Sequence, residues 1–132
     1  MIDRCLQRWY VLAESGGPAG LDDLLSDEAV FQSPIVYTPQ VGKAVTRAYL
    51  AAAMAVLNND AFRYVREVKG DRQAVLEFET ELDGTYVNGV DIIDCDDRGR
   101  ITGFKVMIRP LQAIDLVHRL MRQRLESDRA RP

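Results

Sequence analysis

The fold of this chain is decided by residues 89–101, which read GVDIIDCDDRGRI. Asp91 shares one side of an extended strand with Gly89 and Ile93, because successive side chains of a strand point to opposite faces. The turn DDRG follows, and Ile101 opens the next strand, as expected for an antiparallel hairpin. We therefore predict that Asp91 points into the core. An ionised carboxylate there costs several kcal/mol unless a partner stabilises it, so Asp91 is either hydrogen-bonded structure or part of a site.

The alternation of apolar and polar residues continues on both sides of this hairpin. Strands are predicted near residues 62–69, 72–82, 85–95 and 100–109, with short turns that suit an antiparallel meander. The dipeptide Asn88-Gly89 is itself a hairpin signal, and it could instead mark a bulge inside the third of these strands. Glu77, Glu79 and Glu81 alternate with apolar residues, so this acidic face is predicted to lie outside.

The rest of the chain has the spacing of amphipathic helices. Helices are predicted over about 2–14, 19–25 and 43–57, with a short strand at 29–34 and a loop over 34–42. The third helix is predicted to bury Val45, Tyr49 and Val56. A last helix is predicted over about 111–125, followed by a frayed basic tail to residue 132. These elements predict an α+β fold in which a curved antiparallel sheet wraps around helices, a cone or α+β barrel with a central pocket.

The length, charge and residue composition of the chain disfavour several classes of protein. The chain has 132 residues, enough for a single domain with one core, and no apolar run approaches the roughly 20 residues that a membrane helix needs. A net charge of -3 disfavours a nucleic-acid partner. The first residues lack the features of a secretory signal, so we expect a cytoplasmic protein. With one histidine, two distant cysteines and no Gly-rich phosphate loop, neither a metal nor another cofactor is expected.

Three pieces of sequence point to a known family. They are Ser33-Pro34, Gly42 at the start of a helix eight residues later, and Gly89-Val90-Asp91 leading into residues 96–101. This layout resembles the nuclear transport factor 2-like (NTF2-like) superfamily, and its SnoaL-like branch most of all, over residues 2–110. The resemblance implies a conical pocket and a homodimer. It implies no single activity, because such superfamilies host many chemistries on one fold.

Ketosteroid isomerases have a similar spacing of elements, but this chain lacks most of their site. Their general base is an aspartate directly before the proline, where this chain has Ser33, and their oxyanion tyrosine falls near Trp9. Leu25 and Leu50 stand where supporting tyrosines would be. Asp91 matches the protonated aspartate of that site, which an apolar environment keeps neutral. Isomerisation by the usual base is therefore disfavoured, since a serine needs its own activating base.

We predict that a small, largely apolar molecule enters the pocket. Asp91 is the candidate catalytic residue, as acid, base or hydrogen-bond donor, in chemistry of the isomerase, cyclase or hydratase type. Nine residues are predicted to contact the ligand: Trp9, Phe31, Ser33, Tyr37, Tyr49, Tyr64, Phe78, Phe104 and Ile108.

Two alternatives to an enzyme stay open. The first is a non-catalytic module that binds a small apolar ligand, and the approach of a second ionisable group such as His118 to Asp91 would argue against it. The second is an interaction domain that forms a homodimer through the outer sheet face, where Glu77, Glu79 and Glu81 are followed on neighbouring strands by Asp94, Lys105 and Arg109.

Overall fold

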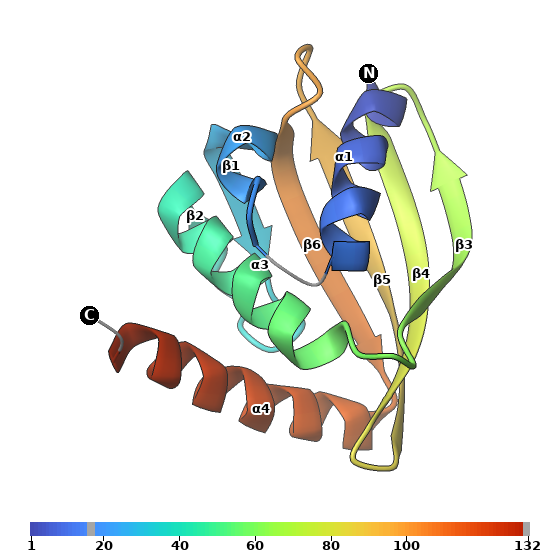
Figure 1. The fold of residues 1–132 in the computed structure, drawn as a ribbon, viewed down its shortest axis with the longest axis vertical. Coiled ribbons are helices and arrows are strands. Elements are labelled where there is room, and N and C mark those ends of the chain that lie inside the picture. The colour runs from blue at the N-terminus through green and yellow to red at the C-terminus, as the bar shows by residue number, and fades with distance from the viewer. Residues whose placement is uncertain (16–17, 131–132) are drawn as a thin grey trace.

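The computed structural model describes residues 1–15 and 18–130, and it shows a strongly curved sheet with the helices on one side (Figure 1). We call the side that faces the helices the inner face. The predicted meander is present as β3 (Arg63–Lys69), β4 (Gln73–Leu82), β5 (Thr85–Cys95) and β6 (Ile101–Arg109). Consecutive strands of this set pair antiparallel. The α+β cone predicted from the sequence is therefore confirmed.

β5 is regular through Asn88-Gly89, which forms neither a hairpin nor a bulge. A Cβ atom on Gly89 would lie 2.5 Å from Cζ of Phe78 and 2.6 Å from the carbonyl oxygen of Met107. The fully buried ring of Phe78 thus occupies the space that a side chain at position 89 would need. Gly89 is therefore not a turn residue. It lies where the Phe78 ring and the backbone of β6 come too close to leave room for a side chain.

Two further strands extend the sheet beyond β6. β1 (Leu25–Gln32) runs parallel to β6, and β2 (Gln40–Val41) pairs antiparallel with β1, which gives the order β2-β1-β6-β5-β4-β3. The second helix, α2 (Leu21–Leu24), ends one residue before its predicted end, and β1 follows it directly, four residues before the predicted start of the strand. Leu25 is fully buried at this junction.

The first and third helices cover the inner face (Figure 1). α1 (Ile2–Ser15) buries Trp9 among its apolar residues, as predicted. α3 (Lys43–Leu57) is rotated from its predicted orientation, because it fully buries Thr46 and Leu50 and leaves Tyr49 half-buried. The Thr46 hydroxyl donates a hydrogen bond to the carbonyl of Ala29 in β1, 3.1 Å away, which fixes that rotation.

The last helix, α4 (Leu111–Ala130), is longer than predicted. The frayed tail expected from residue 126 is helical as far as residue 130, whereas residues 131–132 lie outside the described part of the chain. Arg124 and Asp128, one turn apart, form an ion pair at 3.1 Å that supports this extension.

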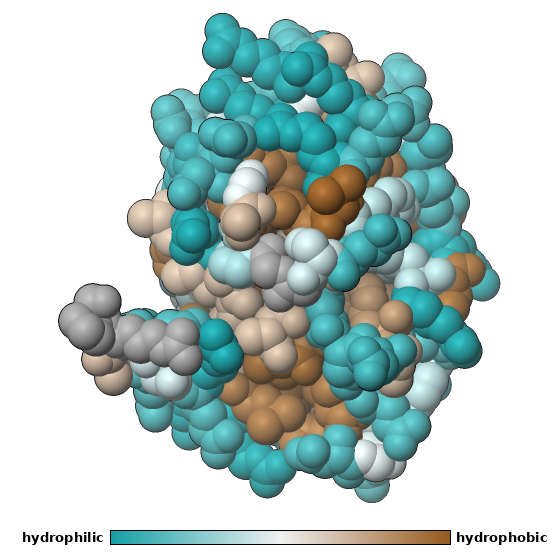
Figure 2. Space-filling model, in the orientation of Figure 1, coloured by the Kyte–Doolittle hydropathy of each residue, from teal (hydrophilic) through white to brown (hydrophobic). Residues whose placement is uncertain are grey.

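α4 packs against α3 and against the ends of β5 and β6. Apolar residues reach the surface in the lower part of Figure 2, in the region of α3 and α4, within a mostly hydrophilic surface. Among the helices of residues 1–15 and 18–130, none is both long and apolar enough to cross a membrane.

Candidate functional site

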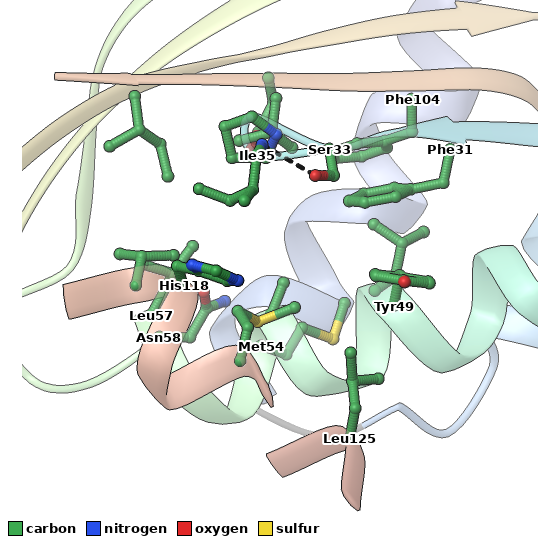
Figure 3. A pocket seen from close by; sticks show the side chains of 18 of the residues that line it. Phe31, Ser33, Ile35, Tyr49, Met54, Leu57, Asn58, Phe104, His118 and Leu125 are labelled. Atoms are coloured by element: carbon green, nitrogen blue, oxygen red, sulfur yellow. Dashed lines mark hydrogen bonds between the residues drawn. The ribbon is translucent and has the colours of Figure 1, made fainter. Parts of the chain in front are cut away.

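A cavity of about 240 Å³ lies between the inner face of the sheet and helices α1, α3 and α4. Its lining is mostly apolar. In Figure 3, Phe31 and Phe104 of the sheet lie on one side of the cavity, and Met54 of α3 and His118 of α4 lie on the other. This volume lies just below the roughly 300–1,000 Å³ typical of sites for drug-sized ligands, so it suits a small molecule.

The structure brings most of the predicted site residues together around this cavity. Asp91 lines it, together with eight of the nine predicted contacts: Trp9, Phe31, Ser33, Tyr49, Tyr64, Phe78, Phe104 and Ile108. The ninth, Tyr37, does not line the cavity, and it is 99% exposed. Tyr37 lies in the segment between β1 and β2, beyond the point where the chain turns away from the cavity.

Asp91 lines the cavity and is 6% exposed. Its Oδ2 atom accepts a hydrogen bond of 2.7 Å from the hydroxyl of Tyr64 on β3. Burial raises the pKa of the Asp91 carboxyl from 3.8 to about 7, against the opposing effect of the Tyr64 hydrogen bond. Near neutral pH this carboxyl is therefore present in both its protonated and its ionised form.

Trp9 fixes the direction of the hydrogen bonds that end at Asp91. The indole Nε1–H can only donate, and it donates to the Tyr64 oxygen at 2.9 Å. The Tyr64 proton is then directed to Oδ2 of Asp91, so a neutral Asp91 carries its own proton on Oδ1. No residue that the structure describes donates to Oδ1, and this oxygen is left for a ligand. Burial and the neighbouring Asp91 charge also raise the pKa of Tyr64, which keeps it a donor.

Ser33 borders the cavity, but its oxygen is occupied by the local backbone. It accepts hydrogen bonds from the backbone N–H groups of Ile35 (Figure 3) and Val36, both at 2.9 Å. This arrangement is a serine turn that shapes the loop after β1. The hydroxyl proton of Ser33 is then the atom that remains for a ligand. The position before Pro34 thus holds a donor and not a base.

His118 of α4 lines the same cavity as Asp91. Its Nε2 atom lies 3.1 Å from an Nη atom of Arg122, one turn further along the helix. Because a guanidinium can only donate, Nε2 is the acceptor in this contact. Within the described residues, no hydrogen bond joins His118 to Asp91.

Stacked and edge-on rings give the cavity a rigid wall. Phe31 stacks on Tyr49 with ring centroids 5.1 Å apart, and Trp9 packs on Phe104 at 4.9 Å. Phe62 stacks on Phe78 at 5.3 Å. Such pairs add to the stability that burial alone provides.

Several lining residues were not predicted from the sequence. Phe62 was assigned only to the start of a strand, and the loop contributes Ile35 and Val36. α4 contributes Arg122 and Arg129, which lie near or beyond the predicted end of that helix. The two arginines could have been identified from their helical spacing relative to His118. The absence of any glycine or proline from residue 111 to residue 131 also indicates that the helix continues that far.

The cysteines lie apart from the cavity. Cys5 and Cys95 are free and buried, and burial raises the pKa of the Cys5 thiol to about 12. Within residues 1–15 and 18–130, no group of three or more histidine, cysteine, aspartate or glutamate side chains is placed to hold a metal ion.

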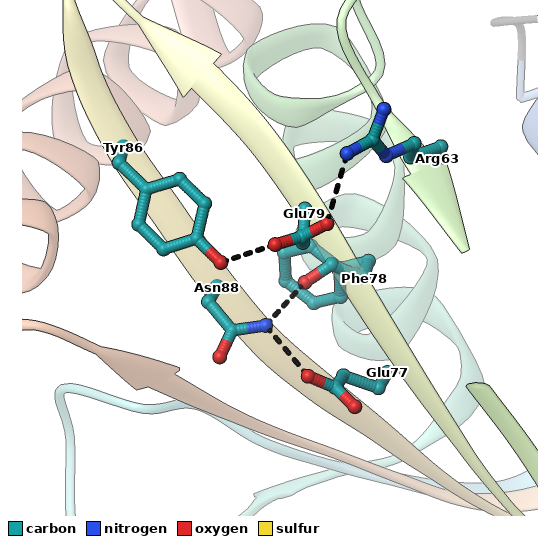
Figure 4. A network of polar contacts seen from close by, with 6 residues as sticks. All are labelled: Arg63, Glu77, Phe78, Glu79, Tyr86 and Asn88. Carbon is teal, nitrogen blue, oxygen red and sulfur yellow. Dashed lines mark hydrogen bonds and ion pairs between the residues drawn. The ribbon is translucent and has the colours of Figure 1, made fainter. Parts of the chain in front are cut away.

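The outer face of the sheet carries a polar network (Figure 4). Glu79 accepts hydrogen bonds from Tyr86 and from Arg63, the latter at 3.1 Å. Asn88 donates to Glu77 at 3.1 Å and to the Phe78 carbonyl at 2.9 Å. The acidic residues of β4 therefore face outward, as predicted.

Known proteins resemble this chain in sequence and in structure. Residues 6–104 match the model of the SnoaL-like domain. A steroid delta-isomerase from Pseudomonas aeruginosa has 33% sequence identity and a TM-score of 0.92, over 98% of this chain and 95% of that one. An uncharacterized protein with a cystatin-like fold from Silicibacter pomeroyi has 25% identity and a TM-score of 0.86, over 94% and 86% of the two chains.

More distant structures share the fold alone. An NTF2-like protein of unknown function from Mesorhizobium loti has 17% identity and a TM-score of 0.71, over 83% of this chain and 91% of that one. No curated protein matches the sequence. The match to the domain model covers most of the chain, and the fold agrees with it. The chain therefore belongs to the SnoaL-like family of the NTF2-like superfamily.

Proposed function

We propose that this protein binds a small, largely apolar molecule in its conical pocket and that Asp91 hydrogen-bonds the polar group of that molecule. The observation that carries the proposal is the chain of hydrogen bonds from Trp9 through Tyr64 to Asp91. It holds the carboxyl in one orientation and leaves Oδ1 to the ligand. A carbonyl, hydroxyl or epoxide oxygen of the ligand would accept the Asp91 proton.

Acid or base chemistry of the isomerase, cyclase or hydratase type is compatible with this arrangement. A group with a pKa of about 7 can donate and accept protons at neutral pH, which is the optimum for a general acid or base. Asp91 would be the catalytic residue. The alternative is a non-catalytic binding module, which the absence of a hydrogen bond between Asp91 and His118 favours.

Steroid delta-isomerisation is a second candidate, because a relative with 33% identity is named for it. Ser33 stands where ketosteroid isomerases have their base, and its oxygen caps two backbone N–H groups. We therefore expect no isomerisation of an unsaturated 3-ketosteroid above the uncatalysed rate. Turnover that Asp91→Asn abolishes would establish this second function in place of simple binding.

Binding of 2-octanone tests the role of Asp91, because this probe has an apolar body and an oxygen that only accepts hydrogen bonds. Trp9 is the sole tryptophan and lines the cavity, so its fluorescence reports occupancy. Affinity should fall about tenfold as pH rises through about 7, since the donor proton is lost. Asp91→Asn should show no such fall, because its amide keeps a hydrogen-bond donor at every pH.

Asp94→Asn is the matched control, because Asp94 lies on the same strand but on the outer face, bonded to Gln73. It should keep the pH dependence of the wild type. Wild-type affinity that does not change between pH 6 and pH 8 would contradict the proposed role of Asp91.

We also propose that the outer face forms a homodimer. Val75, Val90 and Ile92 lie there next to Met107, which is 51% exposed, and the acidic and basic side chains around them allow ion pairs between subunits. Light scattering should give the mass of a dimer, and a monomer at micromolar concentration would contradict this proposal. The cytoplasmic location stays a prediction from the sequence.

A further inference from the structure

The face of α4 that borders the cavity carries positive charge. His118, Arg122, Leu125 and Arg129 are spaced by four, three and four residues, which places them on one side of the helix, and all four line the cavity. Arg122 and Arg129 are exposed, whereas Asp91 is buried. The cavity thus has an open end with two guanidinium groups and an inner end with a carboxyl group.

Neither of these arginines has an acidic partner within residues 1–15 and 18–130. The ion pair that α4 does form joins Arg124 to Asp128, and neither of those residues lines the cavity. Among the residues that the structure describes, Arg122 donates to the imidazole Nε2 of His118 alone. Asp91 is the one carboxylate in the described lining, and it lies at the inner end.

Unpaired guanidinium groups at the entrance of an apolar cavity favour an anion. Arginine binds carboxylate and phosphate groups through charge-assisted hydrogen bonds. The chain as a whole has a net charge of -3 and would repel anions. The charge at this entrance is positive and therefore opposite in sign to the net charge of the molecule. The apolar walls between the two ends suit a hydrocarbon body.

We propose that the ligand is an amphiphilic organic anion. Its apolar body fills the cavity, its inner end meets Asp91, and its carboxylate or phosphate group binds Arg122 and Arg129 at the open end. This inference rests on the proposed function, because it names the chemical class of the molecule that the same pocket would bind.

Three probes that share one octyl group test the inference by their effect on Trp9 fluorescence: nonanoate, octyl phosphate and 1-octanol. At low salt, nonanoate or octyl phosphate should bind about fivefold more tightly than 1-octanol, which is the size expected for a partly exposed ion pair. The preference should shrink as salt is added. The tighter of the two anions identifies the head group.

Arg122→Gln and Arg129→Gln should each reduce the preference for the anion, and the double variant should abolish it, so that the anions bind no more tightly than 1-octanol. Arg119→Gln is the matched control. Arg119 is an exposed arginine of the same helix that does not line the cavity, and its removal changes the net charge by the same amount. Circular dichroism should show all variants folded, since these positions are exposed.

The outcomes separate the two proposals. Equal affinity of the wild type for 1-octanol and both anions would overturn this inference and leave the proposed apolar pocket standing. An equal loss of preference in Arg119→Gln would also overturn it, because the effect would then come from net charge. No response of Trp9 to any of the three probes would overturn the proposed pocket function itself.

Discussion

Asp91 and Glu79 are carboxylates on neighbouring strands of one sheet, and each accepts a hydrogen bond from a tyrosine. Asp91 is on the inner face, and burial raises its pKa to about 7. Glu79 is on the outer face, where the hydrogen bonds from Tyr86 and then Arg63 lower its pKa. The same kind of hydrogen bond thus accompanies opposite shifts, and access to water decides between them. One sheet presents a carboxyl that exchanges protons at neutral pH and another that stays ionised.

The largest expected effect comes from removing the inner carboxyl. The folded protein holds the Asp91 proton up to about pH 7, whereas the unfolded chain releases it near its ordinary pKa of 3.8. The unfolded state therefore binds fewer protons between these values, and the stability contributed by protonated Asp91 is lost as pH rises through this window. The difference corresponds to about 4 kcal/mol as an upper figure. Asp91→Asn should remove this pH dependence.

Urea unfolding of wild type and Asp91→Asn from pH 4 to pH 8 measures this effect. Asp91→Asn should gain stability relative to the wild type up to about pH 7, and the difference should then level off. Asp94→Asn, on the outer face, should follow the wild type. A difference between Asp91→Asn and wild type that is constant over this range would show that the carboxyl is not buried.

The second test compares two glycines on opposite faces. An added Cβ at Gly89 would collide with the Phe78 ring and a backbone carbonyl, whereas at Gly103 it would lie 2.8 Å from Oδ2 of Asp94, a side-chain atom that can move. Gly89→Ala should cost about 3 kcal/mol in unfolding free energy. Gly103→Ala should cost less than about 1 kcal/mol. Equal losses in thermal or urea unfolding would mean that both faces are equally rigid.

The smallest effect is expected from the two tyrosine hydroxyls. Tyr64→Phe leaves the Trp9 N–H and the Asp91 oxygen without their partner and should cost about 1–2 kcal/mol. It should also raise the pKa of Asp91, since the lost hydrogen bond opposes that shift. Tyr86→Phe acts on an exposed pair and should change stability much less. Carbon-13 NMR titration of the carboxyl groups, with urea unfolding, would measure both effects, and a lowered Asp91 pKa in Tyr64→Phe would contradict the hydrogen-bond scheme.

Much of the fold could be predicted because the alternation of apolar and polar residues is strong in the meander. The inward orientation of Asp91 follows directly from that alternation. The position of β1 beside β6 could not be predicted, because parallel pairing between distant segments leaves no short-range signal. The rotation of α3 depends on the hydrogen bond from Thr46 to Ala29, which joins residues far apart in the sequence.

Most residues of the candidate site could be predicted from the sequence, but the hydrogen bonds that join them could not. Aromatic residues at inward positions identified most of the lining, and Asp91 was singled out as the polar exception. The link from Trp9 through Tyr64 to Asp91 joins three separate elements, so only the folded structure reveals it. The position of Tyr37 outside the cavity lining could not be predicted, because an irregular segment has no periodicity to follow.

The two edges of the open sheet are both protected from pairing with another chain. β2 has only two residues, which is too short to template a further strand. β3 is longer, but six of its seven residues are exposed and it bears Arg63, Arg66, Glu67 and Lys69. Its register with β4 also shifts between Tyr64 and Arg66, which bends the edge. A protein that keeps an unclosed sheet around its pocket thereby carries its own defence against edge-to-edge aggregation.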